Sequence, residues 1–191
     1  MPFVSTWTVE LVAEWLQLEG YMAETRLPGL SVPGGGRYEP DVVGVRMDNG
    51  RLKIRHCEVA AGLIGNPKTT GERYAKKFSP EVCEWVTAHF RELFGIEKGK
   101  ECDYEKWVIA NASVEMKEAL RRNVTDLHLE RFDDFIPGTV LPSIRAWQDK
   151  MKTPKNPRPT LSQGLWLLRL LVQLLDYVDP DKKTLASRQA R

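Results

Sequence analysis

The sequence predicts an α/β protein with a mixed central sheet flanked by helices and a helical extension at its C-terminal end. Three observations predict this class. Segments 42–47, 52–59 and 106–111 are rich in apolar and β-branched residues, and segments with helical periodicity lie before and after them. The first two strands are separated by Asp48-Asn49-Gly50, which is typical of a tight antiparallel hairpin. The third is followed by a helix and a further strand, which indicates a right-handed parallel crossover.

Helix and strand signals alternate along the N-terminal part of the chain. Thr6 or Thr8 begins a helix that runs to about Glu19. Residues 21–27 then form a strand, and the glycine-rich segment 28–36 forms a loop before the hairpin.

Two further helices are expected after the hairpin. The first begins at Thr69 or Thr70. The second begins at Ser79-Pro80-Glu81, which combines a cap, a first-turn proline and a first-turn acid, and it ends near Gly95. Its expected inward residues are Val82, Trp85, Val86, Phe90 and Leu93.

The remaining segments complete the sheet and add the extension. Strand 106–111 leads into a helix that Ser113 caps, and then into a strand over 125–132. Pro142 begins another helix, which ends near Lys150. We therefore expect a core over 1–150, a Pro/Lys-rich linker over 151–160, and an apolar helix with a disordered tail over 161–191.

The helix expected over 161–177 is apolar nearly all round, so it needs cover from the core or from a second subunit. We expect a homodimer formed through this helix.

The most apolar window, 164–178, is too short for a comfortable membrane span and contains Arg169. The N-terminus also lacks a signal-peptide pattern, so we expect no membrane association.

Composition limits the classes of function. A chain of 191 residues with 42% hydrophobic residues can bury one well-formed core. Its formal net charge of +2 gives no global basic field, so binding to nucleic acid would depend on local patches. Cys57, Cys83 and Cys102 form no CxxC pair, which argues against a disulfide framework or a structural zinc site. A reducing, cytoplasmic (intracellular) setting fits this usage.

The hairpin carries two acids that we expect to lie together. Asp41 precedes its first strand, and Glu58 lies near the end of its second. Two nearby carboxylates repel one another unless they share a proton or a cation, and Mg²⁺ is commonly held by one or two carboxylates. The alternative is that Asp41 only begins a strand and that Glu58 pairs with Arg55 or a neighbouring basic residue. Alternation places Glu58, His56 and position 60 on one face.

With Glu14 on the first helix, Pro40-Asp41 before the hairpin and Glu58-Val59 on its second strand, the first two-thirds of the chain resembles the PD-(D/E)XK nuclease superfamily. Its members share a mixed sheet flanked by helices, and most hydrolyse phosphodiester bonds in DNA with Mg²⁺. The resemblance implies that Asp41 and Glu58 hold Mg²⁺, for which Mn²⁺ can substitute. It also implies that the Val59 carbonyl is a backbone ligand and that Glu14 completes the site.

The superfamily has lysine where this chain has Ala60. An ammonium there would orient a water and stabilise charge on the phosphate. Three interpretations stay open: the sequence carries a Lys→Ala change made to inactivate the enzyme, Lys68 or Lys76 has taken over the role, or the protein is a degenerate nuclease that binds nucleic acid without cutting it. The intact carboxylates favour the first, since a decayed site would be expected to lose carboxylates as well.

Basic residues just before and on the helix after the hairpin, and in the linker, are the expected DNA contacts, although a solvated surface is the commoner role of such residues. They are Lys68, Arg73, Lys76, Lys77, Lys152, Lys155 and Arg158.

Two other functions compete with the nuclease. His56-Cys57-Glu58 matches half of a zinc-deaminase signature, but the second half is absent. A protein-interaction role would instead centre on the last helix.

Overall fold

The computed structural model describes residues 6–25, 27, 30–31, 37–97, 101–156 and 159–178. The chain divides into two compact units, Met1–Ser143 and Ile144–Arg191. Most of the loop predicted at 28–36 lies outside the described residues, as do Arg158 and the predicted tail beyond Pro180.

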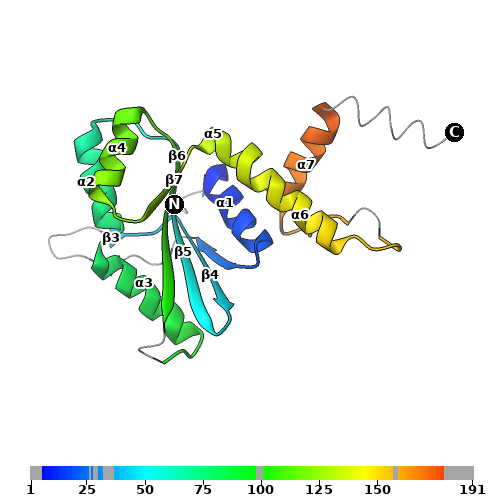
Figure 1. Cartoon of the computed structure of the whole chain (residues 1–191), viewed down its shortest axis with the longest axis horizontal. Coiled ribbons are helices and arrows are strands. Elements are labelled where there is room, and N and C mark those ends of the chain that lie inside the picture. Colours follow the sequence, from blue (N-terminus) through cyan, green and yellow to red (C-terminus); the bar gives the residue numbers. More distant parts are fainter. Residues whose placement is uncertain are drawn as a thin grey trace, which may run out of the picture. The chain divides into compact units, whose positions relative to one another are not determined.

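A five-stranded sheet forms the centre of the first unit (Figure 1). Its strand order is β1 (Met22–Thr25), β4 (Val42–Asp48), β5 (Arg51–Gly62), β6 (Cys102–Asn111) and β7 (Leu127–Glu130). The pairs β1–β4 and β4–β5 are antiparallel, and the pairs β5–β6 and β6–β7 are parallel. The predicted mixed sheet is confirmed. A separate antiparallel pair joins β2 (Leu30–Ser31) to β3 (Arg37–Tyr38).

The hairpin between β4 and β5 turns at the predicted residues. Asn49 and Gly50 both have positive φ, 51° and 80°, as a two-residue turn between twisted strands requires. The register pairs Val42 with Cys57, so Asp41 precedes the first strand on the side of Glu58. Alternation along β5 therefore decides which helices each side chain meets.

Helices cover both faces of this sheet (Figure 1). On one face lies α1 (Trp7–Leu18), where the ring of Trp15 is 5.9 Å from that of Trp107 on β6. On the other face, α3 (Pro80–Leu93) packs on β4 and β5, and α2 (Pro67–Lys77) and α4 (Val114–Asn123) pack on β6. The site described below lies on this second face.

The start of α2 differs from the sequence prediction. Thr69 and Thr70 were the predicted starts, but the helix begins at Pro67. The Asn66 side chain accepts hydrogen bonds from the backbone N–H groups of Lys68 and Thr69, and proline suits the first helical position.

The predicted start of α3 at Ser79 is confirmed. Leu93, which was expected to face the core, is instead 58% exposed.

The predicted strand over 125–132 was too long at both ends. Asp126 has a positive φ of 55° and belongs to the turn before β7, whereas Phe132 begins α5 (Phe132–Phe135). This helix continues without a break into the π-helix η1 (Ile136–Val140) and α6 (Leu141–Met151), so helix begins well before the predicted Pro142. Phe132 and Phe135 are buried. The apolar side chain of Phe132 explains why the predicted strand extends too far.

The second unit contains α7 (Trp166–Val178), which begins five residues later than the predicted Leu161. Trp166, Leu170 and Leu174 on this helix are exposed. No helix among the described residues combines the length and the apolar composition that a membrane span requires.

We predict that Gly71→Ala lowers the free energy of unfolding by about 1–3 kcal/mol, because α2 and α4 approach too closely there for an added methyl group. A Cβ at position 71 would lie 2.7 Å from Asn123 Nδ2 and 3.0 Å from the Ala119 carbonyl oxygen. Urea unfolding measures the change. The control is Gly138→Ala in η1, where a Cβ meets nothing within 4 Å; this variant should leave stability unchanged or raise it by up to about 1 kcal/mol. Equal stabilities of the two variants would contradict the packing argument.

Candidate active site

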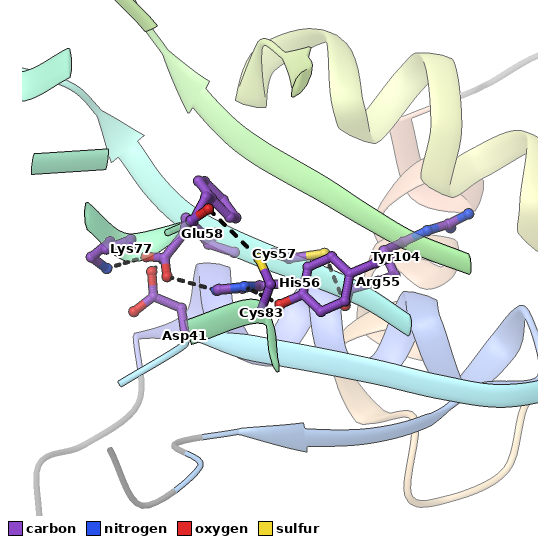
Figure 2. Close-up of polar contacts among 10 residues, drawn as sticks. Asp41, Arg55, His56, Cys57, Glu58, Lys77, Cys83 and Tyr104 are labelled. Atoms are coloured by element: carbon purple, nitrogen blue, oxygen red, sulfur yellow. Dashed lines mark hydrogen bonds and ion pairs between the residues drawn. The ribbon is translucent and has the colours of Figure 1, made fainter. Parts of the chain in front are cut away.

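Asp41, directly before β4, and Glu58, on the adjacent antiparallel strand β5, point toward one another (Figure 2). Asp41 Oδ2 accepts a 2.9 Å hydrogen bond from the backbone N–H of Val59. This bond holds Asp41 against the second strand of the hairpin, beyond the last β4–β5 pair, Val42–Cys57. The structure thus brings together the two acids on which the sequence analysis centred.

Glu58 is 1% exposed, and each of its carboxylate oxygens has a partner. Oε1 accepts a hydrogen bond from His56 Nε2 at 3.1 Å. Oε2 accepts a hydrogen bond from the ammonium of Lys77. The predicted pairing of Glu58 with a basic residue is therefore found, but the partner is Lys77 and not Arg55. Alternation places Arg55 on the opposite face, where its Nε donates to Glu105 at 2.7 Å.

Lys77 reaches Glu58 from the last turn of α2, and its side chain remains 24% exposed. The inward stripe of this helix consists of Thr70, Gly71 and Tyr74, and Phe78 follows at its C-cap. Lys77 lies one turn after Tyr74 on the margin of that stripe, and its Nζ is 5.9 Å from the centre of the Tyr74 ring.

The site raises the pKa of Asp41 to about 7. Burial is the largest cause and the negative charge of Glu58 is the next, whereas the charge of Lys77 and the Val59 N–H offset part of the rise. A hydrogen bond with Glu58, which requires a proton, also favours the acid form of Asp41. Asp41 is therefore about half protonated near pH 7 when no metal ion is bound.

Glu58 behaves in the opposite way. Burial alone would raise its pKa, but the hydrogen bond from His56 and the charge of Lys77 outweigh burial, so the pKa lies below the ordinary glutamate value. The neighbouring hydroxyl of Tyr74 has a raised pKa, first because it is buried and then because Glu58 and Asp41 are negative. The pair thus consists of an ionised Glu58 and a protonatable Asp41.

Two side chains next to Glu58, His56 and Tyr104, are hydrogen-bonded in a way that the sequence does not predict. His56 is wholly buried, and its Nδ1 lies 2.8 Å from the hydroxyl of Tyr104 on β6. Its ring packs against Phe78, with centroids 4.6 Å apart. Alternation had placed His56 on the face of Glu58, but nothing in the sequence pairs it with Tyr104.

The other predicted site residues occupy varied positions. Glu14 is buried on α1, at 6% exposure. Ala60 is partly buried and packs at the edge of the cluster formed by α2, β6 and α4. The predicted basic contacts that the structure describes are exposed, apart from the partly buried Lys77; they are Lys68, Arg73 and Lys76 on α2, and Lys152 and Lys155 in the second unit.

The oxygen atoms around Asp41 suit a hard cation. Asp41 Oδ1, the Glu58 carboxylate and the Val59 carbonyl are oxygen donors of the kind that Mg²⁺ prefers. The Val59 N–H points to Asp41. Because the N–H and C=O of one strand residue point to the same side of the strand, the Val59 carbonyl also faces the side on which Asp41 lies. Among the described residues, no group of three or more His, Cys, Asp or Glu side chains could hold a metal ion. Mg²⁺ does not need such a group, because substrate phosphates complete its shell.

Comparison of the chain with models of protein families, with curated proteins and with solved structures finds no match.

We predict that stability falls as pH rises from about 4 to about 7 in the presence of a chelator, because the folded state keeps the Asp41 proton after the unfolded chain has lost it. Asp41→Asn imitates the protonated side chain. It should match the wild type near pH 3.5 and exceed its free energy of unfolding by about 1–3 kcal/mol at pH 8. Urea unfolding at both pH values measures this difference. Equal stability of the two proteins at pH 8 would contradict the raised pKa.

Proposed function

We propose that the protein is a Mg²⁺-dependent nuclease that hydrolyses phosphodiester bonds in DNA, and that Lys77 supplies the ammonium that the related superfamily has at position 60. One observation carries the proposal: the side chains of Asp41, Glu58 and Lys77 meet near the start of β4 and the end of β5 (Figure 2). The mixed sheet flanked by helices agrees with the fold that the resemblance implies.

Three oxygen donors beside a flexible ammonium are suited to phosphoryl chemistry. Asp41, Glu58 and the Val59 carbonyl would hold Mg²⁺, which supplies a Lewis acid next to the phosphate when it is bound. Lys77 can hydrogen-bond an attacking water or a phosphate oxygen and stabilise the negative charge that develops in the transition state. Positioning and electrostatics of this kind account for most of the catalysis in phosphoryl transfer.

The helix geometry favours Lys77 over the two lysines that the sequence suggested. Lys68 and Lys76 are exposed on α2, on the side away from the stripe that packs against the sheet. Lys77 lies on the margin of that stripe and is hydrogen-bonded to Glu58. We therefore prefer the interpretation in which a helix lysine replaces the strand lysine over the one in which Ala60 is an inactivating change.

We predict that Lys77→Ala lowers the rate of Mg²⁺-dependent DNA cleavage by at least about a hundredfold, because it removes the charge that stabilises the transition state. Lys76→Ala is the matched control, since it removes a neighbouring exposed lysine from the same helix, and it should change the rate by less than about threefold. The double variant Lys77→Ala/Ala60→Lys should recover activity to within about tenfold of the wild type, because it returns an ammonium to the site. Steady-state cleavage of labelled linear and branched DNA measures these rates.

The single variant Ala60→Lys separates the competing interpretations. If Lys77 has the catalytic role, a second lysine should bring no gain. If the chain carries an inactivating change, the wild type should be inactive and Ala60→Lys should restore cleavage. No cleavage by either protein, together with salt-dependent DNA binding, would indicate a degenerate nuclease that only binds.

A further inference from the structure

The buried His56 and the partly buried Tyr104 form a pair next to Glu58 that the proposed chemistry does not use directly. His56 has no exposed surface, yet both of its ring nitrogens have partners from different strands. Nε2 lies 3.1 Å from Glu58 Oε1, and Nδ1 lies 2.8 Å from the Tyr104 hydroxyl. Figure 2 shows the three side chains in a row, with Glu58 at the end that meets Lys77 and Asp41.

We propose that His56, held in place by Tyr104, is a positioning residue for Glu58: it fixes the carboxylate so that Oε2 faces Lys77 and the cation site. This inference rests on the proposed function for the identity of the cation, but the hydrogen-bond arrangement does not depend on DNA cleavage.

With a neutral imidazole, the protons in this row take one arrangement. A carboxylate can only accept a hydrogen bond, so His56 must carry a proton on Nε2 to bind Glu58. The Nδ1 atom then accepts a hydrogen bond from the Tyr104 hydroxyl. Burial raises the pKa of Tyr104, which keeps the hydroxyl protonated as a donor. The tyrosine thereby selects the tautomer that presents Nε2–H to Glu58.

Neighbouring elements leave the imidazole little freedom to move. His56 and Glu58 lie on the same face of β5, two residues apart. Tyr104 comes from the adjacent parallel strand, where it pairs with Ile54. Phe78 packs on the imidazole from the end of α2, directly after Lys77. Because His56 holds Oε1 and Lys77 holds Oε2, rotation of the Glu58 carboxylate would break two hydrogen bonds.

Binding of Mn²⁺ alone, measured by isothermal titration calorimetry, tests the role of His56. His56→Leu fills the space without a donor, and it should weaken Mn²⁺ binding by about 10–100-fold, as is usual when a group behind a metal ligand is lost. His56→Gln places an amide N–H near the position of Nε2 and should retain affinity to within about threefold of the wild type. The control is His89→Leu on α3, whose histidine contacts Glu24 and not Glu58, and it should leave affinity unchanged.

The tautomer gives a second measurement that is independent of metal and of DNA. Nitrogen-15 NMR of labelled histidine should show His56 protonated on Nε2 and unprotonated on Nδ1 in the metal-free protein. In Tyr104→Phe, which removes only a hydroxyl, the Nδ1 signal should shift and Mn²⁺ affinity should fall by about tenfold.

Three results would overturn the inference: a proton on Nδ1 in the wild type, equal Mn²⁺ affinity in His56→Leu and the wild type, or an equal loss of affinity in His56→Leu and His56→Gln. The last result would show that His56 acts only through packing. If the expected tautomer and the difference between the Leu and Gln variants are found in a protein that cuts no DNA, the proposed nuclease function fails and the positioning role of His56 stands.

Discussion

The close approach of two carboxyl groups at a partly buried sheet margin is the constraint on which the rest of this structure depends. Asp41 and Glu58 repel one another when both are ionised, and burial makes that repulsion larger. Lys77 and His56 stabilise the charge of Glu58, and the Val59 N–H and a proton stabilise Asp41. Each of these partners comes from a defined place in the fold, so the position of α2 matters as much as that of the hairpin.

That position depends on helix packing away from the site. Gly71 allows the backbone of α2 to approach α4, and Lys77 follows six residues later, about 9 Å further along the helix axis. Tyr74 and Phe78, one helical turn apart, pack on the sheet and direct the end of the helix toward Glu58. The polar site is therefore held by apolar contacts and by one close helix–helix approach.

The sequence predicted the parts of this arrangement that local signals determine. Asn49-Gly50 fixes the hairpin, and alternation then places Glu58 on the face of His56 and Ala60. It did not predict the contact of Lys77 with Glu58, because the rotation of α2 about its axis depends on tertiary packing; the Tyr74-to-Phe78 spacing was the available signal. Tyr104 lies 48 residues from His56, and only the parallel β5–β6 register brings them together.

The same geometry gives Ala60 a physical explanation under the proposed function. Position 60 follows Glu58 on the same face of β5, so a lysine there would aim its ammonium at a carboxylate that Lys77 already neutralises. Two ammonium groups at one glutamate would repel one another and compete with a divalent cation for its oxygens. An alanine at position 60 avoids that competition and packs at the edge of the apolar cluster. Under the proposed function, Ala60 and Lys77 thus belong to one electrostatic arrangement, in which a single ammonium group serves the site.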